Sequence, residues 1–211
     1  VSLVLSDGTA SVDHNFTITV NNTNDAPTIS GTPATSVNED SLYSFTPTAS
    51  DVDINDTLYF EITNKPSWAD FNTSTGNLSG TPSNDDIGTT TGIVIKVLDG
   101  NESSDTLPSF SIEVNNTNDA PTDINLSSNT IEENSIRGTL IGTLTTSDVD
   151  SGDTFTYSKC GGSDDGNFTI DGSTLKSASI FNYEVKSSYS VCIRSTDSAS
   201  ASYDENFTID I

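Results

Sequence analysis

Basic residues are scarce in this chain. Its 211 residues include 7 Lys and Arg against 31 Asp and Glu, which makes a formal net charge of −24. Nucleic-acid binding needs a basic face, and docking on anionic lipid needs clustered basic residues, so this balance excludes both. Such an acidic chain repels itself unless something neutralises it. Divalent cations suit that purpose, because calcium prefers hard oxygen ligands.

Long apolar runs are also missing. No stretch of 18 apolar residues occurs, so we expect no direct membrane insertion in this segment, and its first residues lack the pattern of a signal peptide. Apolar residues make up 32% of the chain, which is low for a globular protein and leaves disorder as an alternative. These residues are not scattered, however, but lie in short alternating runs that disorder does not require.

Residue types that carry catalysis are few. His14 is the only histidine and lies in a predicted turn, and neither a Gly-x-Ser-x-Gly elbow nor a phosphate loop occurs. We therefore expect no enzyme. Trp68, the only tryptophan, has two interpretations: stacking on a sugar or packing within the fold.

The chain has two cysteines, Cys160 and Cys192. A disulfide between them closes a loop of about 30 residues, contributes ~3–4 kcal/mol in the chain-entropy model, and implies an oxidising compartment. Two free thiols are the alternative, because the sequence does not show that the two Cβ atoms meet.

An internal repeat organises the chain. The segment NNTNDAPT occurs at residues 21–28 and again at residues 115–122. The residues before each copy also match: an alternating strand, Asp-Gly, a polar turn and a second alternating strand, which at the start of the chain runs through Phe16–Val20. This pattern predicts the last two strands of a truncated repeat at 1–24, a complete repeat at 25–117 and another at 118–211.

The fold class predicted is all-β. Apolar residues alternate with polar ones in short segments separated by polar turns, which is typical of antiparallel sheets with one buried face. About seven such strands per unit fit an immunoglobulin-like β-sandwich. The clearest alternating positions are Phe60 and Ile62; Ile93, Ile95 and Val97; Phe110, Ile112 and Val114; Tyr189, Val191 and Ile193; and Phe207, Ile209 and Ile211.

Carboxylates gather where the predicted strands end. Two Asp-x-Asp steps stand in corresponding turns, and the single aspartates Asp7, Asp99 and Asp197 each end a predicted strand. Such a step can direct two carboxylates at one calcium ion, which takes 6–8 oxygen ligands. A solvated acidic turn is the alternative for any one of them. The residues concerned are Asp7, Asp51, Asp53, Asp99, Asp148, Asp150, Asp153 and Asp197.

The linkers resemble those of cadherins. Residues 22–27 and 116–121 both read NTNDAP, close to the cadherin form Asp-x-Asn-Asp-x-Pro. The last unit is similar to the cadherin repeats of bacterial surface proteins, and the middle unit resembles the dystroglycan-type cadherin-like variant. The motifs are Glu133-Asn134, Asp148-Val149-Asp150, Asn182-Tyr183-Glu184 and Ser195-Thr196-Asp197 in the last unit, and KPSWADF (65–71) and TGNLSGTP (75–82) in the middle unit. The resemblance implies tandem cadherin-type antiparallel β-sandwiches of a large surface adhesin.

The resemblance also implies calcium between successive repeats. The ligands it assigns to the first junction are Asn22, Asn24, Asp25, Asp51, Asp53 and Asp99. Those it assigns to the second are Glu39, Asp86, Asn116, Asn118, Asp119, Asp148, Asp150 and Asp197, and Glu133 and Glu184 are expected to face a further repeat. Asn22, Asn116 and Asn182 replace the usual aspartates, so we expect fewer ions or weaker binding. The first junction also lacks the upstream half of its ligands, so we expect poor occupancy there.

These features predict a calcium-rigidified, extracellular or cell-surface extender in a membrane-associated bacterial adhesin. The partners expected are neighbouring repeats of the same long chain, and a glycan or a surface protein as the adhesion ligand, with homophilic adhesion also open. The alternatives are a carbohydrate- or protein-binding module and the spacer domain of an extracellular hydrolase.

Overall fold

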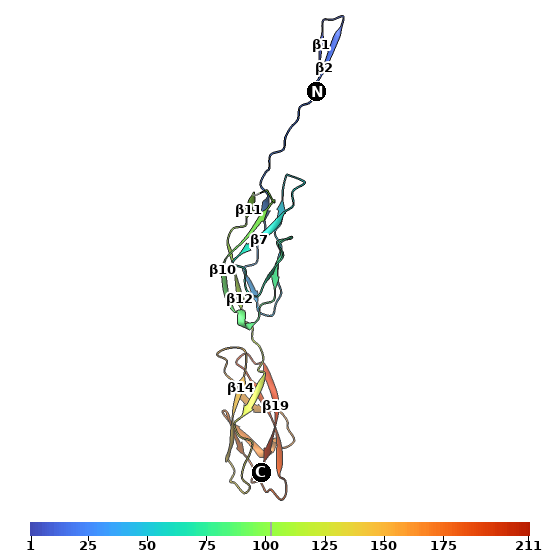
Figure 1. Ribbon diagram of the computed structural model, residues 1–211. Coiled ribbons are helices and arrows are strands. Elements are labelled where there is room, and N and C mark those ends of the chain that lie inside the picture. The colour runs from blue at the N-terminus through green and yellow to red at the C-terminus, as the bar shows by residue number, and fades with distance from the viewer. Residues whose placement is uncertain (102) are drawn as a thin grey trace. The chain divides into compact units, whose positions relative to one another are not determined.

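The computed structural model describes residues 1–101 and 103–211, which separate into two compact units, Val1–Val114 (unit 1) and Asn115–Ile211 (unit 2). Figure 1 shows that their regular structure is almost entirely strand. The helices among the described residues are two short 3₁₀ turns, η1 (Asn84–Asp86) and η2 (Asp165–Asn167). No helix in this described part is long and apolar enough to cross a membrane. The all-β prediction is confirmed.

Unit 1 opens with a hairpin of β1 (Ser2–Ser6) and β2 (Ser11–Asn15), whose residues are all exposed. The sequence predicted a strand through Phe16–Val20, and the structure has none there. Phe16, Ile18 and Val20 are 43%, 63% and 88% exposed. A hairpin of two strands buries too little apolar surface to hold a third segment against it. The strand prediction was wrong here because alternation yields a strand only where a second sheet covers the apolar face.

The rest of unit 1 is a sandwich of short strands. One sheet has the order β11-β10-β12-β4, with β7 also paired to β10, while β5-β9-β8 and β3-β6 form two smaller sheets. The strand bounds are β3 (Thr28–Ser30), β4 (Ser36–Asn38), β5 (Tyr43–Phe45), β6 (Thr48–Ser50), β7 (Tyr59–Thr63), β8 (Asp70–Phe71), β9 (Leu78–Gly80), β10 (Gly88–Leu98), β11 (Ser104–Thr106) and β12 (Phe110–Asn115).

The core of unit 1 follows the predicted alternation. Ile93, Ile95 and Val97 of β10 are completely buried. Trp68 packs edge-on against Tyr43, with ring centroids 5.8 Å apart and planes at 76°, and joins one of the two apolar clusters. The tryptophan therefore packs within the fold.

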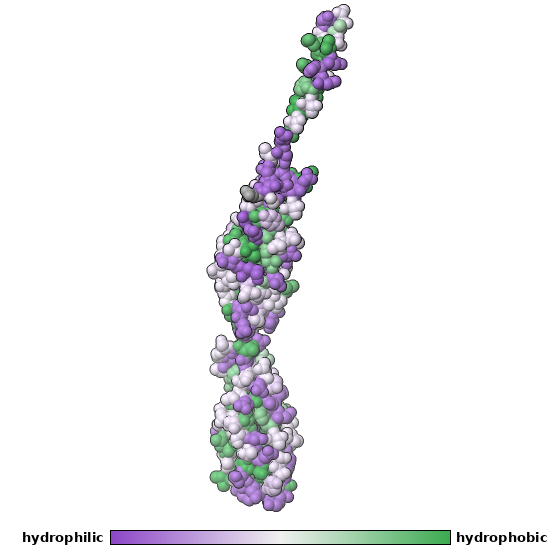
Figure 2. All heavy atoms as spheres, viewed as in Figure 1, coloured by the Kyte–Doolittle hydropathy of each residue, from purple (hydrophilic) through white to green (hydrophobic). Residues whose placement is uncertain are grey.

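Unit 2 is a sandwich of seven strands in two sheets, ordered β13-β14-β17-β16 and β15-β18-β19. The bounds are β13 (Asp123–Leu126), β14 (Leu140–Ser147), β15 (Thr156–Lys159), β16 (Phe168–Asp171), β17 (Thr174–Ser177), β18 (Ser188–Thr196) and β19 (Ser202–Asp210). The long β18-β19 hairpin pairs without interruption, and its inward residues Val191, Ile193 and Ile209 are completely buried. In each unit, Figure 2 shows hydrophilic residues over much of the visible surface, as the composition leads one to expect.

A disulfide crosses from the end of β15 to β18. Cys160 and Cys192 are bonded, with Cα atoms 5.1 Å apart, and the Cys160 N–H donates to the Cys192 carbonyl at 3.1 Å. Beyond the bridge the turn that follows covers the edge of β18. There the carboxylate of Asp165 accepts the Cys192 N–H at 2.9 Å, and that of Asp164 accepts the Ser190 N–H at 2.9 Å.

Candidate metal centre

The acidic cluster of unit 2 is built at the ends of two strands in opposite sheets. Asp148 directly follows β14, Asp197 directly follows β18, and Asp153 lies in the turn before β15. Each of these three residues offers a carboxylate oxygen within 4.8 Å of the others. Asp197 is buried, with 6% of its surface exposed.

Unit 1 contains the same cluster at corresponding positions. Asp51 follows β6, Asp99 follows β10, and Asp56 lies in the turn before β7. Their carboxylate oxygens also lie within 4.8 Å of one another, and Asp99 is 3% exposed. The repeat detected in the sequence therefore extends to the three-dimensional placement of these carboxylates.

An asparagine from the preceding linker is held against each cluster. The side-chain amide of Asn24 donates to Asp99 at 2.8 Å and to the Asp25 carbonyl at 3.1 Å. In unit 2 the amide of Asn118 makes the equivalent bonds, to Asp197 at 2.9 Å and to the Asp119 carbonyl at 2.7 Å. The bonds to the carboxylates lower the pKa of Asp99 and of Asp197, because they favour the charged form.

The second aspartate of each Asp-x-Asp step binds the linker backbone. Asp53 accepts the Asp25 N–H at 2.8 Å and the amide of Asn22 at 2.6 Å, and these bonds lower its pKa. Asp150 accepts the Asp119 N–H at 2.7 Å. The first and second aspartates of each Asp-x-Asp step thus have different tasks: the first joins the cluster of three, and the second fastens the linker.

Several oxygens of the clusters are buried and accept no hydrogen bond. They are Oδ2 of Asp51 in unit 1 and Oδ2 of Asp148 and Asp153 in unit 2. A buried carboxylate oxygen without a donor is costly unless a cation compensates it. The salt bridges of the described residues lie elsewhere, at Asp171, Asp164 and Asp204. A set of buried carboxylate oxygens whose lone pairs accept no hydrogen bond fits calcium.

Two members of these clusters were not assigned to a junction from the sequence: Asp56, which was not considered, and Asp153, which was considered only among the strand-end carboxylates. The signal was present, because both turns read Asp-Val-Asp-x-x-Asp. Asn101 was also missed. Its amide donates to Asn24 at 3.0 Å and to Asp56 at 3.0 Å, so it links the linker to the cluster of unit 1.

The remaining predicted ligands lie outside the two clusters within each unit. Glu39 follows β4 and is buried, and the adjacent Asp40 N–H donates to the Pro82 carbonyl near η1. Asp86 accepts the N–H of Ser83 at 3.0 Å and its hydroxyl at 2.9 Å, which lowers the pKa of Asp86. Asp86 therefore already completes a capping box with Ser83, the N-cap residue of η1.

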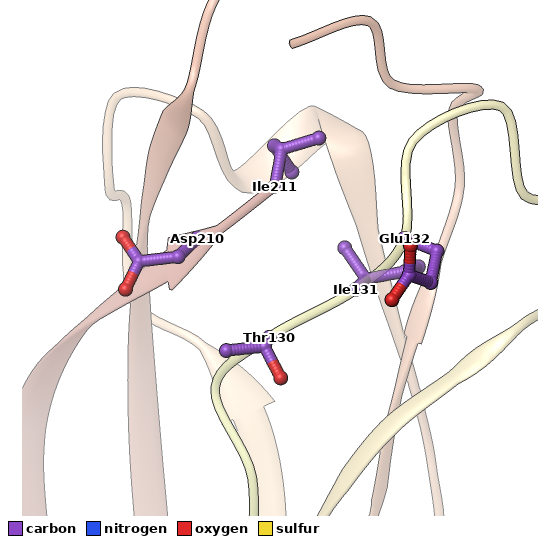
Figure 3. A pocket seen from close by; sticks show the side chains of 5 residues that line it. All are labelled: Thr130, Ile131, Glu132, Asp210 and Ile211. Atoms are coloured by element: carbon purple, nitrogen blue, oxygen red, sulfur yellow. The ribbon is translucent and has the colours of Figure 1, made fainter.

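In unit 2, Glu133 accepts the Tyr183 N–H at 3.1 Å, and Glu184 is exposed. Asn116 is exposed in the linker. Figure 3 shows a shallow hollow where β19 ends, lined by Thr130, Ile131, Glu132, Asp210 and Ile211. Its two carboxylates belong to neither cluster of three.

Each unit matches the model of a known protein family. Residues 26–115 match the model described as Putative Ig domain, and residues 127–211 match the model described as Cadherin domain. Among curated proteins, no sequence matches. The fold and the two clusters thus define a protein of tandem immunoglobulin-like sandwiches. The chain contains two tandem cadherin-like repeats, a Putative Ig domain at residues 26–115 followed by a Cadherin domain at residues 127–211.

Solved structures share this fold at low identity. "PcdhgB3 EC1-4 in 50 mM HEPES" has a TM-score of 0.65 and 22% identity, with 97% of this chain and 54% of that chain covered. Human Protocadherin-24 EC1-2 has a TM-score of 0.58 and 17% identity over 83% of this chain and 92% of that one. Mouse Cadherin-23 EC22-24 has a TM-score of 0.53 and 16% identity, with coverages of 89% and 67%. The chain spans about half the length of the first of these structures.

Proposed function

We propose that this chain is a calcium-binding region of an extracellular bacterial surface adhesin, in which it acts as a structural extender rather than an enzyme. The observation that carries the proposal is the recurrence of the same cluster of three carboxylates in both repeats, each with a buried oxygen that accepts no hydrogen bond. Acidic turns that are merely solvated would not need to bring three carboxylates together in each repeat. Cadherin-type neighbours and a net charge of −24 support the same interpretation.

Calcium would stiffen the chain by fastening its linkers. Asn118 and Asp119 lie in the linker segment at the start of unit 2, before β13, and they already bond with Asp197 and Asp150. An ion held by Asp148, Asp153 and Asp197 would remove the mutual repulsion of these carboxylates and secure the strand ends to which the linker is attached. Glu39, Asp86, Asn116, Glu133 and Glu184 remain ligand proposals that rest on the resemblance to cadherins.

The alternative of a sugar-binding module has less support. It relied on Trp68, whose ring packs against Tyr43 and is partly buried in the sandwich of unit 1. The proposal also includes an adhesion partner that the whole protein binds, and a second copy of the same surface protein is one candidate.

The test is a calorimetric titration of chelator-treated protein with calcium, with magnesium as the control cation. We expect saturable calcium binding that is lost stepwise in Asp99→Asn, Asp197→Asn and the double variant. Small-angle scattering should show a longer maximum dimension in calcium than in chelator. Unchanged scattering would refute rigidification, and the absence of calcium-specific binding would refute the sites themselves.

A further inference from the structure

Three hydroxyl groups form a bridge through the core of unit 2. The hydroxyl of Thr146 on β14 lies 2.7 Å from that of Ser195 on β18 and 2.9 Å from that of Tyr157 on β15. Ser195 is completely buried. Because β14 belongs to one sheet and β15 and β18 to the other, the bond between Thr146 and Ser195 joins the two sheets directly.

The bridge lies immediately beneath the acidic cluster. Thr146 precedes Asp148 by two residues, and Ser195 precedes Asp197 by two residues. Side chains two apart on a strand point to the same face, so each hydroxyl lies one step further into the core than its aspartate. Tyr157 stands opposite Ser195 in the pairing of β15 with β18.

Unit 1 has no such bridge at the corresponding positions. Ala49 precedes Asp51 by two residues, Val97 precedes Asp99 by two, and Phe60 stands opposite Val97 in the pairing of β7 with β10. These three apolar side chains belong to one hydrophobic cluster. The sandwich and its cluster of carboxylates therefore do not require buried hydroxyls, and their presence in unit 2 needs a separate reason, since burying polar groups is costly.

That reason follows from the repulsion between the carboxylates. Without a cation, the carboxylates of Asp148 and Asp197 repel each other at the ends of β14 and β18. Apolar packing sets the distance between the sheets, but it is non-directional and does not by itself fix how these two strand ends are aligned. A hydrogen bond has a narrow range of length and angle, so it holds the two strand ends at one spacing. A ligand set held at its binding geometry loses less free energy when the ion arrives.

We propose that the bridge of Thr146, Tyr157 and Ser195 positions Asp148 and Asp197 for calcium and gives the cluster of unit 2 a higher calcium affinity than that of unit 1. The inference rests on the proposed function. Among the described residues, the cluster of unit 2 has two buried oxygens that accept no hydrogen bond, and the cluster of unit 1 has one. This difference agrees with a higher calcium affinity in unit 2. The three hydroxyl residues contact no ion themselves and act through the aspartates.

The test uses the whole chain with Asp99→Asn, which disables the cluster of unit 1, as the parent. Thr146→Val removes the hydroxyl at nearly constant volume, Thr146→Ser retains it as the matched control, and Ser195→Ala breaks the same bond from the other side. Calorimetry with calcium should show about a tenfold loss of affinity for Thr146→Val and Ser195→Ala, a size typical when a group that orients a metal ligand is removed. Thr146→Ser should bind as the parent does.

Thermal melts in chelator separate this role from packing. If Thr146→Val lowers the melting temperature in chelator but binds calcium as tightly as the parent, the bridge is only a packing contact and the inference is overturned. A parent that binds calcium with every variant unchanged overturns the bridge and leaves the proposed function intact. A parent that binds no calcium while the unsubstituted chain does would place the site in unit 1 and also overturn the inference. If neither binds, the proposed function itself fails.

Discussion

The Asp148→Asn variant should stabilise unit 2 in chelator and reduce the further stabilisation that calcium gives it. Oδ2 of Asp148 is buried without a donor, and a carboxylate oxygen of Asp148 lies within 4.8 Å of those of Asp153 and Asp197. At an effective dielectric constant of about 20, two unit charges at that distance repel by about 3 kcal/mol. After screening by solvent and salt, we expect removal of one charge to stabilise the calcium-free unit by about 1–3 kcal/mol.

The backbone contact of Asp148 should survive the substitution. Asp148 Oδ1 accepts the Asp150 N–H at 3.1 Å, and the amide oxygen of asparagine accepts it equally well. The new amide group can donate to the neighbouring carboxylates. In calcium, by contrast, the variant has lost a charged ligand and should gain less from the ion than the unsubstituted chain does.

Scanning calorimetry in chelator and in excess calcium measures both effects. Trp68 lies in unit 1, so its fluorescence identifies the transition of that unit and leaves the other to unit 2. We expect the melting temperature of unit 2 to rise by about 5–15 °C in chelator and its calcium-dependent increase to shrink. Asp123→Asn, which removes a charge from an exposed residue of unit 2, is the matched control for net charge. An equal fall in melting temperature under both conditions would refute the argument from repulsion.

Three further predictions concern the stability of unit 2. Reduction of the Cys160–Cys192 disulfide, whose partners are 32 residues apart, should destabilise the unit by about 3–4 kcal/mol, measured by urea unfolding with and without reductant; equal midpoints would contradict it. Ile193→Ala, at a completely buried position, should cost about 3 kcal/mol in the same assay, and a loss below about 1 kcal/mol would mean that the cavity collapses. The Lys186 ammonium donates to Asp164 at 2.6 Å and, together with a backbone N–H, lowers the pKa of the Asp164 carboxyl. The stability that this carboxylate contributes is therefore present above its unfolded pKa near 4 and is lost as the pH falls through its lower folded pKa. Lys186→Met should therefore lower the urea midpoint at pH 7 by the equivalent of about 0.5–1 kcal/mol, and by less as the pH falls through the folded pKa of Asp164. Lys186 also lies 4.6 Å from the centroid of the Tyr189 ring, a contact that acid does not remove, so an effect that does not shrink in acid would assign the loss to that contact and to packing.

The buried faces of the strands could be predicted because alternation is a local property. In β10 and β18 the predicted inward positions, such as Ile95 and Ile193, are completely buried. The same reasoning failed at Phe16–Val20, where no sheet covers the segment. An alternating pattern states which side chains would share a face, but whether that face is covered depends on other parts of the chain.

The acidic clusters were predictable in part. Asp51 and Asp99 end strands, so the sequence indicated that their carboxylates lie at the end of the sandwich. Asp56 and Asp153 reach the clusters only because each turn folds back after its Asp-x-Asp step. Conversely, Asp86, which the resemblance assigned to calcium, completes a capping box with Ser83 at the start of η1, and the Ser-x-x-Asp spacing is the sequence signal for that role.

The sequence by itself determined the repeat, the strands that face a core and the surplus of carboxylates at strand ends, because each follows from residue order along an extended backbone. Only the tertiary structure decided which carboxylates meet and which hydroxyls bridge the core. Thr146 and Ser195 are 49 residues apart, and their contact depends on how closely two sheets pack. That distance is a property of the whole sandwich, since every side chain between the sheets contributes to it.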